Sequence, residues 1–363
     1  MTESPHPLLP PGTAVLRLGE DEFTGGTVQV GGVDGADGVR ICPAGPGIDA
    51  LLRRLDGRRS ERQVRGESAA DGTPADVVDD VLGGLRAAGL VHDLTAADLL
   101  AVDPGPAAAA RALPELPSAG ARAGAGGRWR DRRQSAVVVD GATRVGTPLA
   151  AVLAASGVGR VHVRDRGSTL AAEAVVGGVA ASDEGRPRSL AAADAVRRVS
   201  PLTELGPLPP GRSPDVVVLC RPWAALDPLT TALQREGTPH LVATVRGETG
   251  VVGPLVLPGS SSCLRCADAW RREDDPAWPR LATQLSAREP AHSGATVTCL
   301  LTALTAAVQV LAHLDGDATP AAVDATLEFR PPALLPRLRR WPRHPGCACS
   351  GPAGGAATGQ HGQ

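Results

Sequence analysis

The spacing of four cysteines constrains this chain more than any other feature. Cys263 and Cys266 are separated by two residues, and Cys347 and Cys349 by one. Each pair is short enough for both sulfurs to reach one ion, and tetrahedral Zn²⁺ accepts four thiolates at about 2.3 Å. The two pairs therefore predict a structural Zn²⁺ site. Four thiolates leave no coordination position for water, so this metal would join two distant segments of the chain rather than catalyse a reaction.

Alternative explanations of the cysteines remain open. The first pair could be a redox motif accompanied by two incidental cysteines, although such a motif normally lies between a strand and a helix of a small domain. His344 could replace one thiolate on the metal, although four cysteines are available. The other cysteines lie in apolar stretches and are predicted to be core residues, namely Cys42, Cys220 and Cys299.

Length and composition indicate a cytoplasmic protein of two domains. A chain of 363 residues exceeds one ordinary core. Hydrophobic residues make up 42% of the sequence, so the chain can bury a core. The net charge is -2, so the chain carries no overall positive charge that would attract nucleic acid. The most apolar run, residues 295–314, is broken by Thr, Gln and His and is not expected to span a membrane. The N-terminus lacks the pattern of a secretion signal, which favours a reducing compartment and metal thiolates over disulfides.

Residues 10–94 predict a small α+β domain with a winged-helix-like layout. Extended segments are expected at residues 14–18 and 39–42 from their apolar character. The first expected helix has one apolar face, formed by Ile48, Leu51, Leu52 and Leu55. The second opens after a proline, Pro74, and presents Val77, Val78, Val81, Leu82, Leu85 and Leu90.

Two segments are predicted to lack regular structure. Residues 95–133 are rich in Ala, Pro, Gly and Arg without sustained periodicity, which predicts a flexible linker. Residues 351–363 hold no apolar residue larger than Ala apart from one Pro, and are expected to be a disordered tail. Residues 134–350 are then the second domain.

The second domain is predicted to be a doubly wound α/β fold. A buried strand at residues 135–141 leads through a glycine-containing turn into a helix, and then into a strand at residues 161–165. Strands at residues 215–220 and 240–245 have the continuous apolar character of a parallel sheet that is covered on both faces. The helix carries its apolar residues at Val145, Leu149, Val152 and Leu153.

The glycine turn of this domain is a candidate nucleotide site. Gly141 and Gly146 bound a turn between strand and helix, where a phosphate would bind, and Asp165 ends the next strand, where a ribose-binding carboxylate would lie. The middle glycine of GxGxxG is replaced by Thr143, whose β-branched side chain should crowd a phosphate. Nucleotide binding and a Rossmann-like scaffold without ligand both remain open.

Residues 135–350 contain a series of motifs in the order GATRVG, VRD, GRPRS, DVVVLCR, PGSSSCLRC, TVTCLLTALTAAVQVL and HPGCAC. This order resembles the ThiF/MoeB adenylyltransferase (ubiquitin-activating-like) family. It implies a Rossmann-type sheet closed by the four-cysteine zinc site, and a homodimer. It also implies a nucleotide site at Gly141, Gly146, Asp165 and Arg188.

The departures from that family fall on the ATP chemistry. Arg188 replaces the family's Lys, Arg221 replaces its Mg²⁺-binding Asp, and LAAEAVVGGVA replaces its Asn/Arg/Gln segment after Asp165. Adenylation needs Mg²⁺ held by carboxylates, and an Arg both removes that ligand and repels the ion. We therefore expect no ATP cofactor, no ordinary adenylation and no catalytic residue.

The N-terminal domain resembles a second family. Residues 47–64 and 74–93 are similar to the PqqD-like recognition modules of ribosomal peptide maturation, which hold a leader peptide as an added strand on a sheet edge. In thiazole/oxazole (bacteriocin) pathways such modules are fused to a ThiF-like domain, and residues 270–285 resemble a segment of that group. A helical cap that packs on the second domain or mediates dimerisation is the alternative. The charge run at residues 271–275 is expected to be solvated.

These resemblances imply a scaffold that binds a leader peptide and presents it to a separate YcaO-type cyclodehydratase. The first alternative is an ATP-dependent adenylyltransferase that activates the C-terminus of a sulfur-carrier or ubiquitin-like protein, with Asp165 on the ribose and Arg188 on phosphate. The second alternative is a structural dimeric partner with neither activity.

Overall fold

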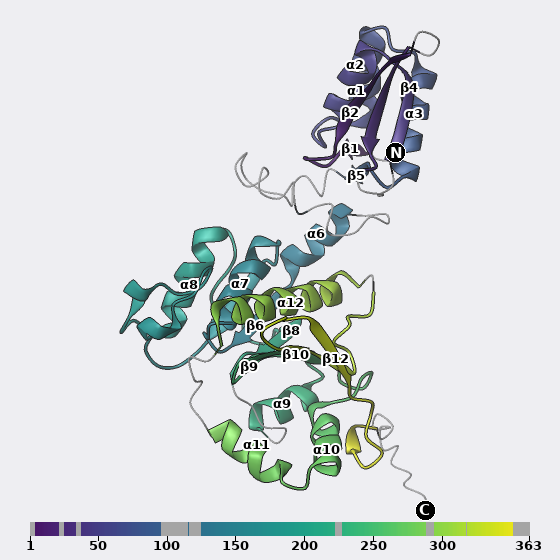
Figure 1. Ribbon diagram of the computed structural model, residues 1–363. Helices are drawn as coiled ribbons and strands as arrows, with labels where there is room; N and C mark the ends of the chain where they lie inside the picture. Colours follow the sequence, from purple (N-terminus) through teal and green to yellow (C-terminus); the bar gives the residue numbers. More distant parts are fainter. Residues whose placement is uncertain are drawn as a thin grey trace, which may run out of the picture. The chain divides into compact units, whose positions relative to one another are not determined.

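The computed structural model describes residues 4–21, 25–33, 38–95, 115, 125–221, 227–287, 294–316 and 318–350. The chain divides into two compact units, Met1–Arg133 and Gln134–Gln363 (Figure 1). Each unit has a hydrophobic core of its own.

The first unit combines small antiparallel sheets with helices. Its elements are β1 (His6–Leu8), β2 (Val15–Asp21), β3 (Gly25–Gly31), β4 (Gly38–Ala44), α1 (Pro46–Arg54), α2 (Glu61–Ala70), α3 (Ala75–Ala87) and β5 (His92–Leu94). One sheet has the order β2-β3-β4 and the other pairs β1 with β5. Val28, Val30 and Ile41 alternate onto the buried face of the larger sheet and pack in the same cluster as the apolar faces of α1 and α3.

The sequence predicts part of this unit. Both expected helices are present as α1 and α3, and both expected strands as β2 and β4. The helix α2 and the strand β3 were not predicted. Only Val64 and Ser68 are buried in α2, so its apolar periodicity is weak. Whether the unit is a winged-helix relative stays a prediction.

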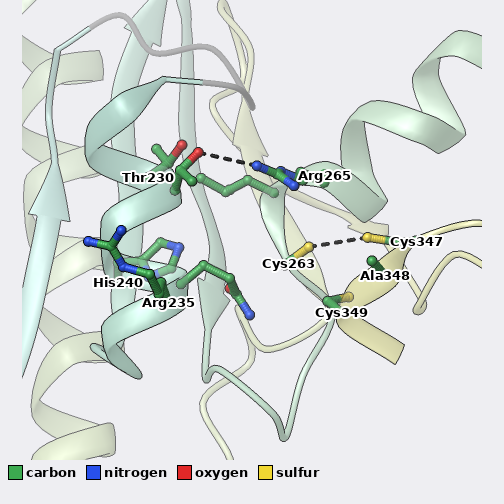
Figure 2. A pocket seen from close by; sticks show the side chains of 11 residues that line it. Thr230, Arg235, His240, Cys263, Arg265, Cys347, Ala348 and Cys349 are labelled. Atoms are coloured by element: carbon green, nitrogen blue, oxygen red, sulfur yellow. Dashed lines mark hydrogen bonds between the residues drawn. The ribbon is translucent and has the colours of Figure 1, made fainter. Parts of the chain in front are cut away.

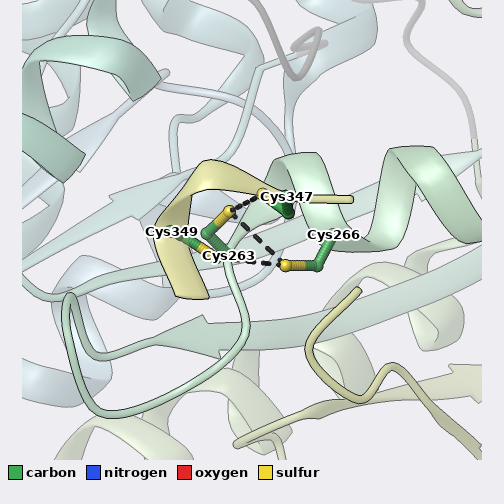
Figure 3. A group of neighbouring side chains, drawn as sticks. All are labelled: Cys263, Cys266, Cys347 and Cys349. Atoms are coloured by element: carbon green, nitrogen blue, oxygen red, sulfur yellow. Dashed lines mark hydrogen bonds between the residues drawn. The ribbon is translucent and has the colours of Figure 1, made fainter. Parts of the chain in front are cut away.

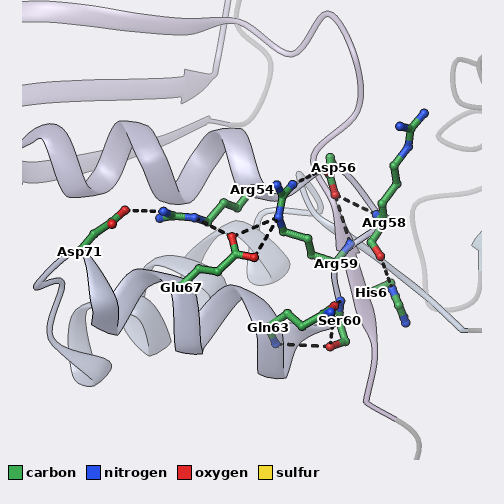
Figure 4. A network of polar contacts seen from close by, with 9 residues as sticks. All are labelled: His6, Arg54, Asp56, Arg58, Arg59, Ser60, Gln63, Glu67 and Asp71. Carbon is green, nitrogen blue, oxygen red and sulfur yellow. Dashed lines mark hydrogen bonds and ion pairs between the residues drawn. The ribbon is translucent and has the colours of Figure 1, made fainter.

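Polar contacts hold α2 in place (Figure 4). The Ser60 hydroxyl accepts a hydrogen bond from the Gln63 backbone N–H, and the Gln63 side chain accepts one from the Ser60 N–H, which forms a capping box. Glu67 of α2 accepts hydrogen bonds from Arg54 and Arg59, each at 3.1 Å. Such exposed ion pairs contribute about 0–1 kcal/mol each, so the cap and the buried face of α2 carry its position.

The residues predicted as a linker include a helix. Residues Ala125–Gln134 form α6, which ends where the second unit begins. Apart from Thr95 and residue 115, the remainder of the predicted linker lies outside the described residues, as does the predicted tail from residue 351.

The second unit is a mixed α/β fold with one sheet between two layers of helices, which confirms the α/β class. Its elements are β6 (Ala136–Asp140), α7 (Gly146–Ala155), β7 (Arg160–Arg164), η1 (Ala171–Glu173), η2 (Ala181–Asp183), α8 (Arg188–Val199), β8 (Val216–Leu219), α9 (Pro228–Glu236), β9 (His240–Arg246), β10 (Thr249–Val256), α10 (Leu264–Asp274), α11 (Trp278–Ala287), α12 (Thr296–Asp315), β11 (Ala325–Phe329), β12 (Pro336–Arg340) and η3 (Ala348–Ser350). The described strands form a seven-stranded sheet of order β12-β11-β10-β9-β8-β6-β7. The strands β7, β6, β8 and β9 are parallel, and the remaining strands pair antiparallel.

Both faces of this sheet are covered. Val137 and Val139 of β6 point to one face, where they pack in one cluster with residues of α7, α8 and α12. Val138 points to the other face and packs with residues of α9 and α10. The two helix layers are visible on either side of the sheet in Figure 1. The continuous apolar sequence of the parallel strands follows from this double coverage.

Helix α12 is a core helix of this unit. By length and composition it is the one helix of the described residues that is long and apolar enough to cross a membrane. It packs on α7, β9 and β10, and its side chains Cys299, Ala303 and Ala306 are fully or almost fully buried.

The charge run at residues 271–275 corrects one expectation. Residues 272–275 are exposed, as expected, but Arg271 is largely buried. Its guanidinium group lies 4.2 Å from the ring centre of Trp341 and 5.1 Å from that of Trp278. Burial, together with Arg246 and Arg339, lowers the pKa of Arg271. The cation therefore serves to stack α10 on two tryptophans rather than to face solvent.

Candidate functional site

The structure brings the four predicted metal ligands together. Cys263 precedes α10 and Cys266 lies in its first turn, while Cys347 and Cys349 come from the C-terminal segment around η3 (Figure 3). All four sulfurs lie within 4.8 Å of one another. The distances are 3.8 Å for Cys263–Cys266, 3.6 Å for Cys263–Cys347 and 3.2 Å for Cys266–Cys349. A tetrahedron of thiolates around Zn²⁺ has edges of about 3.8 Å, so the cluster could hold a metal ion.

The surroundings of the cluster suit a metal thiolate site. Cys263 and Cys266 are buried in the apolar cluster beneath α9 and α10. Burial raises the pKa of the Cys263 thiol. A thiolate at this position therefore requires a nearby cation to compensate its charge, which a bound metal ion supplies.

His344 does not take part in the cluster. Its Nε2 atom lies 2.8 Å from a carboxylate oxygen of Glu273, and its Nδ1 accepts a hydrogen bond from the Gly346 N–H. Its ring also packs edge-on against Trp270. Both ring nitrogens thus have partners, so the proposed exchange of His344 for a thiolate is not supported.

The three other cysteines divide into two environments. Cys220 and Cys299 are buried, as predicted, and burial raises the pKa of both thiols. The prediction of a core position for Cys42 is wrong, because Cys42 is exposed. On β4 the side chains alternate, and Ile41 takes the buried position next to it.

The backbone of the glycine turn requires both of its predicted glycines. It connects β6 to α7, and Gly141 has a φ of 118°, which L side chains rarely adopt. A Cβ atom at Gly146 would lie 2.0 Å from the Gly141 carbonyl oxygen. Both predicted glycines are therefore required by the turn itself, with or without a ligand.

Thr143, at the position of the missing glycine, makes hydrogen bonds within the turn. Its hydroxyl oxygen accepts hydrogen bonds from the backbone N–H groups of Val145, at 3.3 Å, and Gly146, at 3.0 Å. Amides at the start of such a helix are the groups that bind phosphate in nucleotide sites. In this turn they are already satisfied by a side chain.

The two other predicted nucleotide-site residues are also engaged within the chain. Asp165 accepts a hydrogen bond from the Ala142 N–H at 2.7 Å. Arg188 forms a buried ion pair with Glu173, in which Nη2 lies 2.6 Å from Oε1 and Nε lies 3.1 Å from Oε2. Asp165 and Arg188 approach to 4.0 Å. The structure therefore gathers these side chains near the glycine turn, but it pairs them with protein groups.

Sequence reasoning missed one buried carboxylate beside this turn. Asp140, the last residue of β6, accepts a hydrogen bond from Arg164 at 2.9 Å and one from Arg221 at 2.7 Å. Although burial acts to lower it, pairing with Asp140 raises the pKa of Arg221. The signal was present in the sequence as an Asp that ends an otherwise apolar strand.

Comparisons with known proteins identify the family of this chain and solved structures of similar fold. Residues 121–349 match the ThiF family. A solved structure of E. coli MccB with ATP has a TM-score of 0.61 and 15% identity, covering 95% of this chain and 99% of that chain. E. coli MccB with MccA-N7isoAsn gives 0.60 and 14%, with coverages of 94% and 99%. PaaA gives 0.59 and 16%, with coverages of 91% and 99%.

At these identities the likeness to MccB and PaaA shows a shared fold. No curated protein matches the chain. The family match spans more than half of the sequence and includes the glycine turn and all four clustered cysteines. This protein belongs to the ThiF family.

Proposed function

We propose that this protein is a scaffold of ribosomal peptide maturation that does not itself adenylate. Its N-terminal unit binds a leader peptide, and its ThiF-like unit, stapled by one Zn²⁺ on Cys263, Cys266, Cys347 and Cys349, presents that peptide to a separate YcaO-type cyclodehydratase.

The internal pairing of the glycine turn carries this proposal. The phosphate-facing amides are bound by the Thr143 hydroxyl, Asp165 is bound by a backbone N–H, and Arg188 is bound by Glu173. ATP would have to break these contacts before it could bind the same protein groups. Arg221 also stands near the position where a metal-binding carboxylate is needed, and it neutralises the nearby carboxylate of Asp140.

An open sheet edge supports peptide binding by the N-terminal unit. Among the described residues β4 pairs with β3 on one side only, which leaves its other edge for an added strand. Helix α3 lies next to this strand. A Cβ atom at Gly84 of α3 would contact only Val39 of β4, at 3.8 Å. The likeness to MccB covers 95% of this chain, and MccB has been solved with N-formylated MccA.

The second candidate is an adenylyltransferase that acts on the C-terminus of a peptide or small carrier protein. One observation favours it, because the MccB structures of the same fold include complexes with ATP and with AMPCPP. The expectation that ATP is not a cofactor of this chain therefore stays a prediction.

Two measurements separate these candidates. Calorimetric titration of the full chain with ATP·Mg²⁺ should give no binding heat, and ATP–pyrophosphate exchange should stay at the background of a heat-denatured sample, with and without the candidate peptide. Robust exchange that depends on the peptide would eliminate the scaffold and establish the adenylyltransferase.

A homodimer is also proposed, and the outer face of α12 supports it. Val297, Leu304 and Val308 recur along one side of this helix and are exposed. Apolar stripes of this kind mark interaction surfaces. Sedimentation equilibrium should give twice the chain mass, and Val308→Asp should shift the equilibrium to the monomer. A monomeric wild-type protein at micromolar concentration would refute the dimer.

A further inference from the structure

The strand β12 forms one edge of the seven-stranded sheet, and all of its residues are exposed (Figure 1). Among the described residues it pairs only with β11, in an antiparallel register that extends from Phe329–Pro336 to Ala325–Arg340. The outer side of an edge strand presents a row of main-chain N–H and C=O groups, which can pair with a strand from another chain. This edge is therefore a candidate surface for an added strand.

The chain around this edge is strongly basic. Residues 329–350 contain no Asp or Glu and five arginines, namely Arg330, Arg337, Arg339, Arg340 and Arg343. Two of these arginines pair with carboxylates of other segments. Arg337 and Arg340 have no ion pair within the part of the chain that the structure describes. The edge thus offers guanidinium groups to an acidic ligand.

The side chains of β12 alternate between the two faces of the sheet. Leu338 lies opposite Leu327, which packs against the core cluster that includes α12. Arg340 shares that face with Leu338, and Arg337 lies on the other face, because successive side chains of a strand alternate. A strand that pairs with β12 would therefore meet one unpaired cation on each face, with the half-exposed Leu338 between them.

Contacts beyond β12 hold this edge in place. Trp341 follows the strand directly and is almost fully buried, and its indole N–H donates to the Thr326 hydroxyl at 3.1 Å. The chain then reaches the cysteine cluster, where Cys347 and Cys349 line a cavity beside α9 (Figure 2). Because the edge is ordered before a ligand binds, strand addition costs less conformational entropy.

Charge determines which partner suits this edge. Arginines on an edge strand disfavour pairing with a second copy of the same strand, since like charges would lie side by side. They favour a strand that carries carboxylates. Nucleic acid is also anionic, but its backbone lacks the alternating N–H and C=O groups that pair with a strand. The overall charge of -2 provides no general attraction for it either.

We propose that β12 binds an acidic, extended segment of a partner protein as an additional strand of the sheet. Main-chain hydrogen bonds hold the segment on the outer edge, while its carboxylates pair with Arg337 on one face and Arg340 on the other. An apolar side chain between the carboxylates packs on Leu338. The inference does not depend on the proposed leader site, because that site lies on β4 of the first unit.

The test is calorimetric titration of the full, metal-loaded chain with the peptide acetyl-Thr-Glu-Glu-Val-Glu-Glu-Thr-amide. Its sequence is the same in both directions, so it can pair with β12 in either orientation. The peptide with Gln in place of each Glu should bind about tenfold more weakly, because it lacks the carboxylates. The acidic peptide with N-methyl groups on its three central residues should also bind about tenfold more weakly, because it has lost main-chain donors.

Variants of the edge complete the test. The double variant Arg337→Gln/Arg340→Gln should bind the acidic peptide about tenfold more weakly than the wild type. The matched control is Arg197→Gln/Arg235→Gln, which removes two exposed arginines of α8 and α9 and should leave the affinity unchanged. Bound metal content and far-UV circular dichroism establish that both variants are folded.

Four results would overturn the proposal. The first is the absence of binding by the acidic peptide, and the second is an equal affinity for the Glu and Gln peptides or for the methylated and unmethylated peptides. The third is an equal loss of affinity in the two double variants. The fourth is tighter binding of an oligothymidylate than of the acidic peptide, which would assign the edge to nucleic acid. If the edge variant fails to fold, the three peptides still decide the proposal on the wild-type chain.

Discussion

At the scale of single residues, the glycine turn departs from the GxGxxG pattern at Thr143, whose side chain makes hydrogen bonds within the turn. Gly141 and Gly146 keep the loop shape, while Thr143 binds the amides that would face a phosphate. The sequence predicts the loss of the middle glycine, but not this contact. The position of a hydroxyl depends on the folded turn around it, and the expected effect of Thr143 was steric crowding alone.

Replacing Thr143 tests whether its hydroxyl blocks anion binding. Thr143→Gly removes the acceptor of the Val145 and Gly146 amides, so we expect pyrophosphate to bind about tenfold more tightly than to the wild type. The loss of this cap should also cost about 1 kcal/mol of stability. Thr143→Ser retains the hydroxyl and is the matched control in the same calorimetric titration. Equal pyrophosphate affinity of the Gly and Ser variants would count against the blocking role.

His240 predicts a pH dependence of stability. Burial lowers its pKa from the ordinary 6.5, so below pH 6.5 the unfolded chain binds the proton more readily than the folded one. Stability is therefore retained above pH 6.5 and falls as the pH decreases below it, by at most about 1.4 kcal/mol per pH unit for this group. Urea unfolding at pH 7.5 and 5.5 should show a smaller loss for His240→Gln than for the wild type, and the comparison cancels the contribution of the other histidines. An equal loss would refute the assignment.

At the scale of elements, prediction succeeded where one residue pattern determines an element. The parallel strands β6, β8 and β9 read as continuous apolar runs because both faces of the sheet are covered. Helix α2 was missed because only Val64 and Ser68 of this helix are buried, which leaves its apolar periodicity weak. Its start signal, Ser60 followed by Gln63, was present in the sequence. Arg271 was misjudged because stacking between Trp278 and Trp341 depends on tertiary contacts.

The cysteine cluster should act as a staple between α10 and the C-terminal segment. Cys349→Ser removes one of four sulfurs, so we expect bound zinc to fall well below the roughly one equivalent per chain of the wild type, and the melting temperature to fall with it. Limited proteolysis should then cleave near residue 345 in the variant before it does so in the wild type. Cys42→Ser is the control, because Cys42 is exposed on β4 in the first unit and should retain both metal and stability. Full metal content in Cys349→Ser would exclude the staple.

At the scale of the whole molecule, the order of motifs predicted the family more firmly than the chemistry. The family match over residues 121–349 follows from glycine turn, strands and cysteine pairs that all occur in sequence order. Whether the site is active depends on which groups pair with each other in space, such as Arg188 with Glu173 and Asp140 with Arg221. These partners are far apart in the sequence or lie in a segment without a recognisable motif. Membership of the ThiF family therefore does not by itself determine whether this glycine turn binds a nucleotide.

Division of the chain into two units gives the last prediction, which concerns peptide binding. Each unit has its own core, so residues 134–363 should fold without the first unit. We expect the full chain to bind a leader peptide encoded beside its gene, and residues 134–363 alone to lose this binding by at least about a hundredfold, because the open edge of β4 is absent.

Acidic side chains outnumber arginines over residues 1–95, so the affinity for a basic leader should fall as salt increases. Fluorescence anisotropy of a labelled leader measures both effects, and a scrambled leader of equal charge separates sequence recognition from charge attraction. Undiminished binding by residues 134–363 would move the peptide site to the ThiF-like unit and refute the role of the first.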